Sequence, residues 1–324
     1  MQFKDIFGHE RNISLLKSFL KQGRLPHALL FHGAPGIGKK TTAKVFAKAL
    51  NCTNDIYDSC DLCPSCQKVD HNNHLDVMII KPDGQYIKIQ AIRDLQQQLK
   101  FKPWEGKKRV CIIEDAERMN DVSANALLKT LEEPPSSNVI ILITEKPHLL
   151  PATVASRCQQ VRFNPLKDED VVLYMIEKLH VKKSAARVLA SSSGGSIERA
   201  LELHNGAYLA IRDKILEMVS EENIQEPIIK LAHTRCFGDE REEVIERLEI
   251  LRMFYRDVLL YRETSDINGL INVDRIEIIQ NLSQRLQTRE IIRNINIIDN
   301  VFMAIESNAD RTLALETMML RIAM

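Results

Sequence analysis

A glycine-rich stretch, GAPGIGKKT at residues 33–41, constrains the fold of this chain more than any other feature. It follows an apolar run at 28–31 and opens a helical apolar pattern at 45–50. Glycines between a strand and a helix let backbone N–H groups point inward, and the helix N-terminus adds its positive dipole end. The stretch therefore predicts a phosphate-binding loop, in which Lys39 reaches the β- and γ-phosphates. The residues expected to form it are Gly33, Gly36, Gly38, Lys39, Lys40 and Thr41.

The residue after Lys39 departs from the pattern of a hydrolytic site. Phosphate-loop ATPases place a Ser or Thr hydroxyl there to bind Mg²⁺, and this chain has Lys40. Thr41 cannot replace that hydroxyl, because one step along a helix rotates the side chain by about 100°. A second interpretation places Lys40 on a solvated stripe with Lys44 and Lys48. On either interpretation the hydroxyl ligand of Mg²⁺ is missing. We therefore expect Mg²⁺ to be absent and ATP or ADP to bind weakly or not at all.

An acidic pair follows a second buried strand. The apolar run at 110–113 is typical of a strand covered on both faces of a parallel sheet. Glu114 and Asp115 come next, at the strand end where ligands bind in doubly wound folds. In phosphate-loop ATPases an aspartate that holds Mg²⁺ comes first here and a glutamate follows, so the order in this chain is reversed. We therefore interpret the pair as the remnant of a metal site, with a solvated strand end as the alternative. Thr144, which ends the apolar run at 139–143, is expected beside the nucleotide site.

Four of the seven cysteines lie within fifteen residues, in a module at about 51–68. A disulfide framework is unexpected in a reducing compartment. Two overlapping CxxC steps with one upstream cysteine fit tetrahedral thiolate binding of Zn²⁺ in a structural site. His71 and His74 are nearby alternative ligands, and a redox CxxC is an alternative function. The expected zinc ligands are Cys52, Cys60, Cys63 and Cys66.

Strand and helix patterns alternate as far as residue 164, which predicts an α/β domain with a parallel sheet and helices on both faces. After that point the patterns are helical, with a break at 191–196 that separates a small domain at 165–206 from a helical bundle at 207–324. One long helix in the bundle carries a coiled-coil-like apolar stripe. Its members are Val244, Leu248, Leu251, Tyr255 and Val258.

Composition excludes some partners and compartments. Lys+Arg and Asp+Glu each number 44, so no global field attracts the chain to nucleic acid or to an anionic membrane. The first residues lack the apolar core of a signal peptide, and no apolar run approaches the length of a membrane span. We therefore expect a cytoplasmic protein that has no membrane partner.

Several stretches together resemble the clamp-loader branch of the AAA+ family. The most specific is SANALLKTLEEPP followed by SRC at 156–158. The others are GRLPHALLFHGAPGIGKK, the cysteine module, VCIIEDAERM, TEKPHLLPATVASRC and NADRTLALETMMLRIAM. The resemblance covers essentially the whole chain. It implies an AAA+ phosphate-loop domain with an inserted four-cysteine zinc site, a helical lid and a C-terminal oligomerisation domain, or collar.

Within this branch some subunits hydrolyse ATP and others carry eroded nucleotide motifs. Lys40, the reversed pair Glu114 and Asp115, and Glu198 in the lid place the chain with the second type, because Glu198 stands where active members have an arginine for the γ-phosphate. The resemblance then implies a subunit of DNA polymerase III that helps load the sliding clamp onto primed DNA. Its partners would be the gamma/tau ATPase and delta subunits, with clamp and DNA reached through the complex. Alternatives are an active gamma/tau-type ATPase and, for the cysteine module, a nucleic-acid-binding finger.

Arg157 is the central residue of the SRC motif. A lone arginine near a strand end is ordinarily a surface residue. The resemblance implies that it projects across a subunit boundary onto the ATP of a neighbouring subunit. A guanidinium suits this role, because it stays charged and presents a planar fork to phosphate oxygens.

Overall fold

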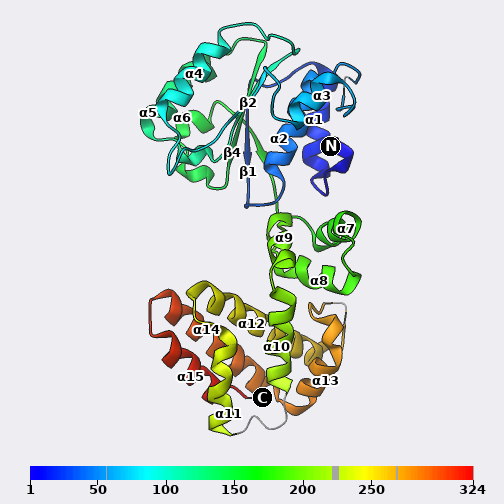
Figure 1. Cartoon of the computed structure of the whole chain (residues 1–324), viewed down its shortest axis with the longest axis vertical. Coiled ribbons are helices and arrows are strands. Elements are labelled where there is room, and N and C mark those ends of the chain that lie inside the picture. The colour runs from blue at the N-terminus through cyan, green and yellow to red at the C-terminus, as the bar shows by residue number, and fades with distance from the viewer. Residues whose placement is uncertain (56, 221–225, 268, 324) are drawn as a thin grey trace. The chain divides into compact units, whose positions relative to one another are not determined.

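The computed structural model describes residues 1–55, 57–220, 226–267 and 269–323 (Figure 1). The chain divides into two compact units. The first comprises Met1–Tyr174 and Gly194–Arg199, and the second comprises Met175–Ser193 and Ala200–Met324. Within the described residues, no helix combines the length and apolar character that crossing a bilayer requires.

The first unit is built on a parallel sheet, as the sequence predicts; the sheet has five strands in the order β2-β3-β4-β1-β5. Because the strands are parallel, the carboxyl ends of β1, β3 and β4 lie along one edge. The strands are β1 (Ala28–His32), β2 (Val77–Ile80), β3 (Arg109–Ile113), β4 (Asn138–Thr144) and β5 (Gln159–Arg162).

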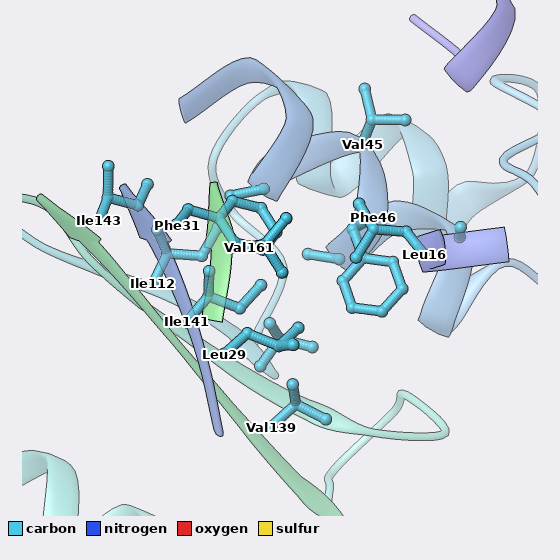
Figure 2. Packing of buried hydrophobic residues seen from close by; sticks show 14 of the residues in the cluster. Leu16, Leu29, Phe31, Val45, Phe46, Ile112, Val139, Ile141, Ile143 and Val161 are labelled. Carbon is cyan, nitrogen blue, oxygen red and sulfur yellow. The ribbon is translucent and has the colours of Figure 1, made fainter. Parts of the chain in front are cut away.

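Side chains alternate between the two faces of this sheet, and each face has its own apolar core. In β1, Leu29 and Phe31 lie on one face with Phe46 of α2 and Leu16 of α1 (Figure 2). Ala28 and Leu30 point to the other face, against α4, α5 and α6. Strands covered on both sides explain the continuous apolar runs in the sequence.

Local sequence signals mark both ends of α5. The Asn120 side chain accepts a hydrogen bond from the Ser123 N–H (2.9 Å), and the helix ends at Glu132, just before the Pro134-Pro135 pair. The helices are η1 (Phe3–Asp5), α1 (Glu10–Gln22), α2 (Lys39–Asn51), α3 (Pro64–Asp70), α4 (Ile89–Leu99), η2 (Ala116–Arg118), α5 (Asp121–Glu132), η3 (Pro147–Leu149) and α6 (Ala152–Ala155).

The described residues after β5 are helical wherever they are regular, as predicted. The long helix α12 packs beside α13 and α14, and all five residues of its predicted stripe are buried. The helices are α7 (Asp168–Leu179), α8 (Lys183–Ser192), α9 (Ile197–Asn205), α10 (Tyr208–Ser220), α11 (Pro227–Ala232), η4 (His233–Phe237), α12 (Arg241–Thr264), η5 (Val273–Arg275), α13 (Ile276–Arg285), α14 (Thr288–Glu306) and α15 (Arg311–Arg321).

A fully buried ion pair ties the loop before β3 to the sheet. Asp76, immediately before β2, accepts hydrogen bonds from the backbone N–H groups of Trp104, Glu105 and Gly106 at 2.8–2.9 Å. Its Oδ1 also accepts one from Arg109 Nη2 at 2.9 Å. Burial raises the pKa of the Asp76 carboxyl, but these hydrogen bonds outweigh burial and lower it. Asp76 is therefore a main organiser of this end of the sheet.

Replacing Asp76 with alanine is expected to lower the free energy of unfolding by about 3–5 kcal/mol, because Arg109 would remain buried without its partner. The difference in free energy of unfolding between wild type and the Asp76→Ala variant should shrink in acid. A lowered folded-state pKa means that the carboxylate stabilises the fold above the unfolded-state value of about 3.9 and stops doing so as pH falls through the folded value. Urea unfolding across a pH series measures both effects. Asp83→Ala, which removes a solvent-exposed partner of Lys88, should match wild type.

Candidate phosphate-binding site and cysteine cluster

The glycine-rich loop lies between β1 and α2, at the carboxyl edge of the sheet. Gly36 has φ +68, and a Cβ there would come within 2.2 Å of Ser196 Oγ. A Cβ on Gly33 would come within 2.2 Å of the Phe163 carbonyl oxygen. A side chain at either position would collide with its surroundings. Gly38, with φ +98, caps the start of α2. The backbone thus has the strand–turn–helix form of a phosphate-binding loop.

Lys39, the first residue of α2, lies within the loop. Its Nζ donates hydrogen bonds to the carbonyl oxygens of Gly33 (2.7 Å) and Ala34 (2.5 Å). Burial lowers the pKa of this ammonium more than the nearby carboxylates raise it. The buried Thr144 at the end of β4 accepts a hydrogen bond from the Gly33 N–H at 3.3 Å, and Thr41 is half-buried in the first turn of α2. The structure thus places these predicted residues together around one loop.

Lys40 and the acidic pair form an ion-paired cluster at the same edge. Lys40 Nζ lies 3.2 Å from Glu114 Oε2 and 3.7 Å from Asp115 Oδ1. Glu114 is nearly buried, and Asp115 has a left-handed backbone with φ +49. Lys81, which follows β2, places its Nζ 3.8 Å from the same Glu114 oxygen. Burial lowers the pKa of Lys40, but Glu114 and Asp115 outweigh burial and raise it.

These contacts test whether the site fits a Mg²⁺ ion. The residue that should supply a hydroxyl supplies an ammonium, and that ammonium already pairs with both carboxylates. An ammonium repels a divalent cation and offers it no lone pair. The residues present therefore do not fit Mg²⁺.

The interpretation of Lys40, Lys44 and Lys48 as one solvated stripe is wrong for Lys48. That side chain is only 1% exposed, and its Nζ bonds Asp61 Oδ1 (2.5 Å) and Asp70 Oδ2 (2.7 Å). Lys44 remains at the surface, where its Nζ bonds the Asn72 side chain at 2.9 Å. Helical spacing alone could not predict that Lys48 is buried, because the burial arises where the cysteine module folds over this side of α2.

The segment 194–199 belongs to the same compact unit as the loop and contacts it directly. The Glu198 N–H donates a hydrogen bond to the Gly36 carbonyl oxygen at 3.2 Å. Arg199, one residue later, is exposed. A Cβ on Gly36 would lie 3.1 Å from Glu198 Oε2. The Glu198 carboxylate thus lies beside the glycine turn and adds negative charge where a phosphate-binding site needs positive charge.

The four predicted cysteines come together. Their sulfur atoms all lie within 4.8 Å of one another, and Cys52 Sγ and Cys63 Sγ are 4.0 Å apart. Four thiolates around Zn²⁺ at about 2.3 Å would have sulfurs about 3.8 Å apart. Cys60 is half-buried, and Cys52, Cys63 and Cys66 are buried.

Backbone N–H groups point at these sulfurs, as expected around thiolates. The Cys66 N–H donates to Cys63 Sγ at 3.4 Å, and the Cys63 N–H donates to Cys60 Sγ at 3.3 Å. Burial raises the pKa of the Cys63 thiol, but hydrogen bonds from Thr53 and Cys66 outweigh burial and lower it to about 5. The cluster therefore fits a structural Zn²⁺ held by four cysteines.

The alternative histidine ligands lie outside the cluster. His74 shares a hydrogen bond with Ser65 Oγ through Nε2 (3.1 Å), and its Nδ1 accepts one from the Asp76 N–H. His71 Nδ1 contacts the Gln67 carbonyl oxygen at 2.7 Å. Both rings therefore have structural partners.

Arg157 lies at the opposite edge of the sheet from the phosphate loop, because it precedes the amino end of β5 while the loop follows the carboxyl end of β1. Its Nη1 donates to the Thr153 carbonyl oxygen (2.9 Å), and its Nη2 lies 2.6 Å from Glu132 Oε1. The side chain is 36% exposed. It therefore does not join the phosphate loop of its own chain.

Sequence reasoning missed Lys81 and Glu132 as partners of predicted site residues. Lys81 directly follows the apolar run of β2, so its place at the carboxyl edge was available from the strand pattern. Glu132 gave no comparable signal, because its contact with Arg157 depends on how α5 and α6 pack.

The parallel sheet, the glycine-rich loop after β1 and the acidic pair after β3 define the chain as a phosphate-loop protein of the AAA+ class. The family described as "DNA polymerase III, delta subunit" matches residues 8–167, and its C-terminal counterpart matches residues 208–323. The chain belongs to this clamp-loader family of DNA polymerase III.

Relatives of more than one subunit type share this sequence. The delta' subunit of Bacillus subtilis is 33% identical over 77% of this chain and 76% of that protein. The tau subunit of the same organism is 30% identical over 92% of this chain, which spans 57% of tau. The tau subunit of Escherichia coli is 33% identical, and this chain spans 33% of it.

The solved structures that this chain matches include a gamma-subunit-related protein of Thermotoga maritima and the RuvB branch migration motor of the same organism. The first is 18% identical over 95% of this chain and 97% of that chain, with a TM-score of 0.38. The second is 16% identical over 81% of this chain and 78% of that chain, with a TM-score of 0.44.

Proposed function

We propose that the chain is a delta-prime-type clamp-loader subunit of the DNA polymerase III holoenzyme, which helps load the sliding clamp onto primed DNA. The observation that carries this choice is the Lys40 ammonium, 3.2 Å from Glu114 and 3.7 Å from Asp115. It stands where a working ATPase needs a hydroxyl and a metal ion. The similarity to a delta' subunit over most of both chains supports the same choice. An active gamma/tau-type ATPase is the second candidate, because tau subunits are also similar.

In this proposal the partners are the gamma/tau and delta subunits, and the complex brings the chain to the clamp and primed DNA in the cytoplasm. We assign residues 1–164 to the AAA+ domain, 165–206 to the lid and 207–324 to the oligomerisation collar. Exposed apolar side chains in the collar, such as Met303 and Leu313, suit a surface that partner subunits cover. The cysteine cluster holds a structural Zn²⁺.

The chain's own contribution to catalysis is then the trans-acting Arg157. Its position across the sheet from the loop of the same chain supports action on a neighbour. Three guanidinium N–H donors remain beyond the two that the structure pairs, and they can face phosphate oxygens.

The isolated chain is expected to release phosphate from ATP at the background rate in the presence of Mg²⁺, and to enter a complex with gamma/tau and delta subunits. Without an organised metal ion, the charge of the transferring phosphoryl group is not stabilised. Steady-state phosphate release and mass photometry measure the two properties. Turnover similar to that of an active gamma/tau subunit would favour the second candidate, and failure to assemble would refute both.

A further inference from the structure

We propose that Lys40 is a tethered cation that takes the place of a divalent metal ion, so that the phosphate-loop site is indifferent to Mg²⁺. The ammonium occupies the space between the first turn of α2 and the carboxyl end of β3, where it pairs with Glu114 and Asp115. Exchange of this one residue for threonine would then open the acidic pair to the Mg²⁺ that accompanies a nucleoside diphosphate.

The geometry of the acidic pair supports a cation-binding role that Lys40 satisfies. The Glu114 side chain is only 8% exposed, so it would be costly to keep ionised without a close positive charge. Asp115, with its left-handed backbone, turns its carboxylate to the same ammonium. Both carboxylates thus converge on one positive charge although they are adjacent along the chain.

A tethered ammonium differs from a metal ion in two ways. It is always present at the site, whereas a metal ion must bind from solution, so a metal ion would have to displace it. It also carries one charge and donates hydrogen bonds, whereas Mg²⁺ carries two charges and needs octahedral oxygen ligands.

Lys81 is a weaker second cation. Its Nζ is 3.8 Å from Glu114 Oε2, and its side chain is 66% exposed. Although Glu114 is buried, the Lys81 ammonium is solvated and lies near the outer limit of an ion pair, so this contact adds less than the 3.2 Å contact of Lys40. Lys81 therefore does not substitute for Lys40 when Lys40 is replaced.

The test compares wild type with Lys40→Thr. Lys44→Thr is the matched control, because Lys44 lies one turn further along the same helix and bonds Asn72 instead of the acidic pair. The double variant Lys40→Thr with Glu114→Gln tests whether a gain depends on the carboxylate. In the first measurement each protein is titrated with a fluorescent ADP analogue, once in excess Mg²⁺ and once in EDTA. In the second, each protein is titrated with Mn²⁺, with and without ADP, and bound Mn²⁺ is followed by electron paramagnetic resonance. Thermal unfolding and zinc content show that each variant is folded.

We expect Lys40→Thr to bind the ADP analogue at least about tenfold more tightly in Mg²⁺ than in EDTA, and to bind Mn²⁺ in the presence of ADP. Wild type and Lys44→Thr should differ by less than about twofold between the two buffers, and the double variant should lose the gain. The proposal is overturned if wild type itself needs Mg²⁺, or if Lys40→Thr shows no Mg²⁺-dependent gain by either probe.

The inference rests on the degenerate nucleotide site of the proposed function, but the two fail separately. A chain that assembles with gamma/tau and delta subunits yet shows no gain in Lys40→Thr refutes only the tethered cation. A chain in which Lys40→Thr gains Mg²⁺ dependence but that does not assemble refutes only the clamp-loader role.

Discussion

Arg157→Ala is expected to slow ATP hydrolysis at the one subunit boundary that Arg157 serves by about 10³- to 10⁵-fold, the range of trans-acting arginines in well-studied phosphoryl transfer. Total ATPase of the complex should fall only in part, because the other boundaries keep their own arginines. The measurement is DNA- and clamp-stimulated phosphate release by the complex assembled with the variant. Clamp loading should fall in parallel.

Folding should not change in this variant. Arg157 pairs with Glu132 at a partly exposed position, with side chains 36% and 50% exposed, and such pairs contribute little to stability. Zinc content and assembly should therefore match wild type.

Arg157→Lys retains the charge but loses the planar fork, so we expect it to restore only part of the rate. Arg11→Ala, an exposed arginine of α1, is the surface control. Wild-type ATPase and clamp loading by the Arg157→Ala complex would show that Arg157 is an ordinary surface residue.

Loss of the metal is expected to have the largest effect on stability. We predict one Zn²⁺ per chain in protein purified without added metal, and a loss of more than about 4 kcal/mol in the free energy of unfolding when Cys63 is replaced with serine. Metal analysis and chemical denaturation are the measurements. Cys236→Ser, a half-buried cysteine outside the cluster, should keep one Zn²⁺ and nearly wild-type stability. A zinc-free chain that is fully folded would contradict the prediction.

The expected size follows from what the cysteine module covers. Lys48 of α2 is buried beneath it, and its ammonium bonds Asp61 of the module and Asp70 at the end of α3, just after the module. Burial lowers the pKa of Lys48, but these two carboxylates outweigh burial and raise it to about 12. When the module unfolds, Lys48 loses its partners in the same step. The cost of metal loss therefore includes a broken ion pair as well as the metal–sulfur bonds.

The sequence by itself determined the elements that depend on neighbours along the chain. The glycine spacing at 33–41 specified a turn that requires positive φ, as at Gly36. Continuous apolar runs identified the strands covered on both faces, and the alternation of strands with helices identified a parallel sheet. The spacing of the four cysteines identified the cluster, because short loops keep their sulfurs within reach of one ion.

The tertiary structure alone decided which charges meet. Lys40 and Glu114 are far apart in the sequence, and they meet because the strand order places the carboxyl ends of β1 and β3 along the same edge, with only β4 between them. Lys48 is buried rather than solvated because a module inserted after α2 folds back over it. Helical and strand periodicity report only which side of an element a residue occupies. Which side chain from another element a residue contacts depends on strand order, register and helix packing, and no local sequence pattern contains these.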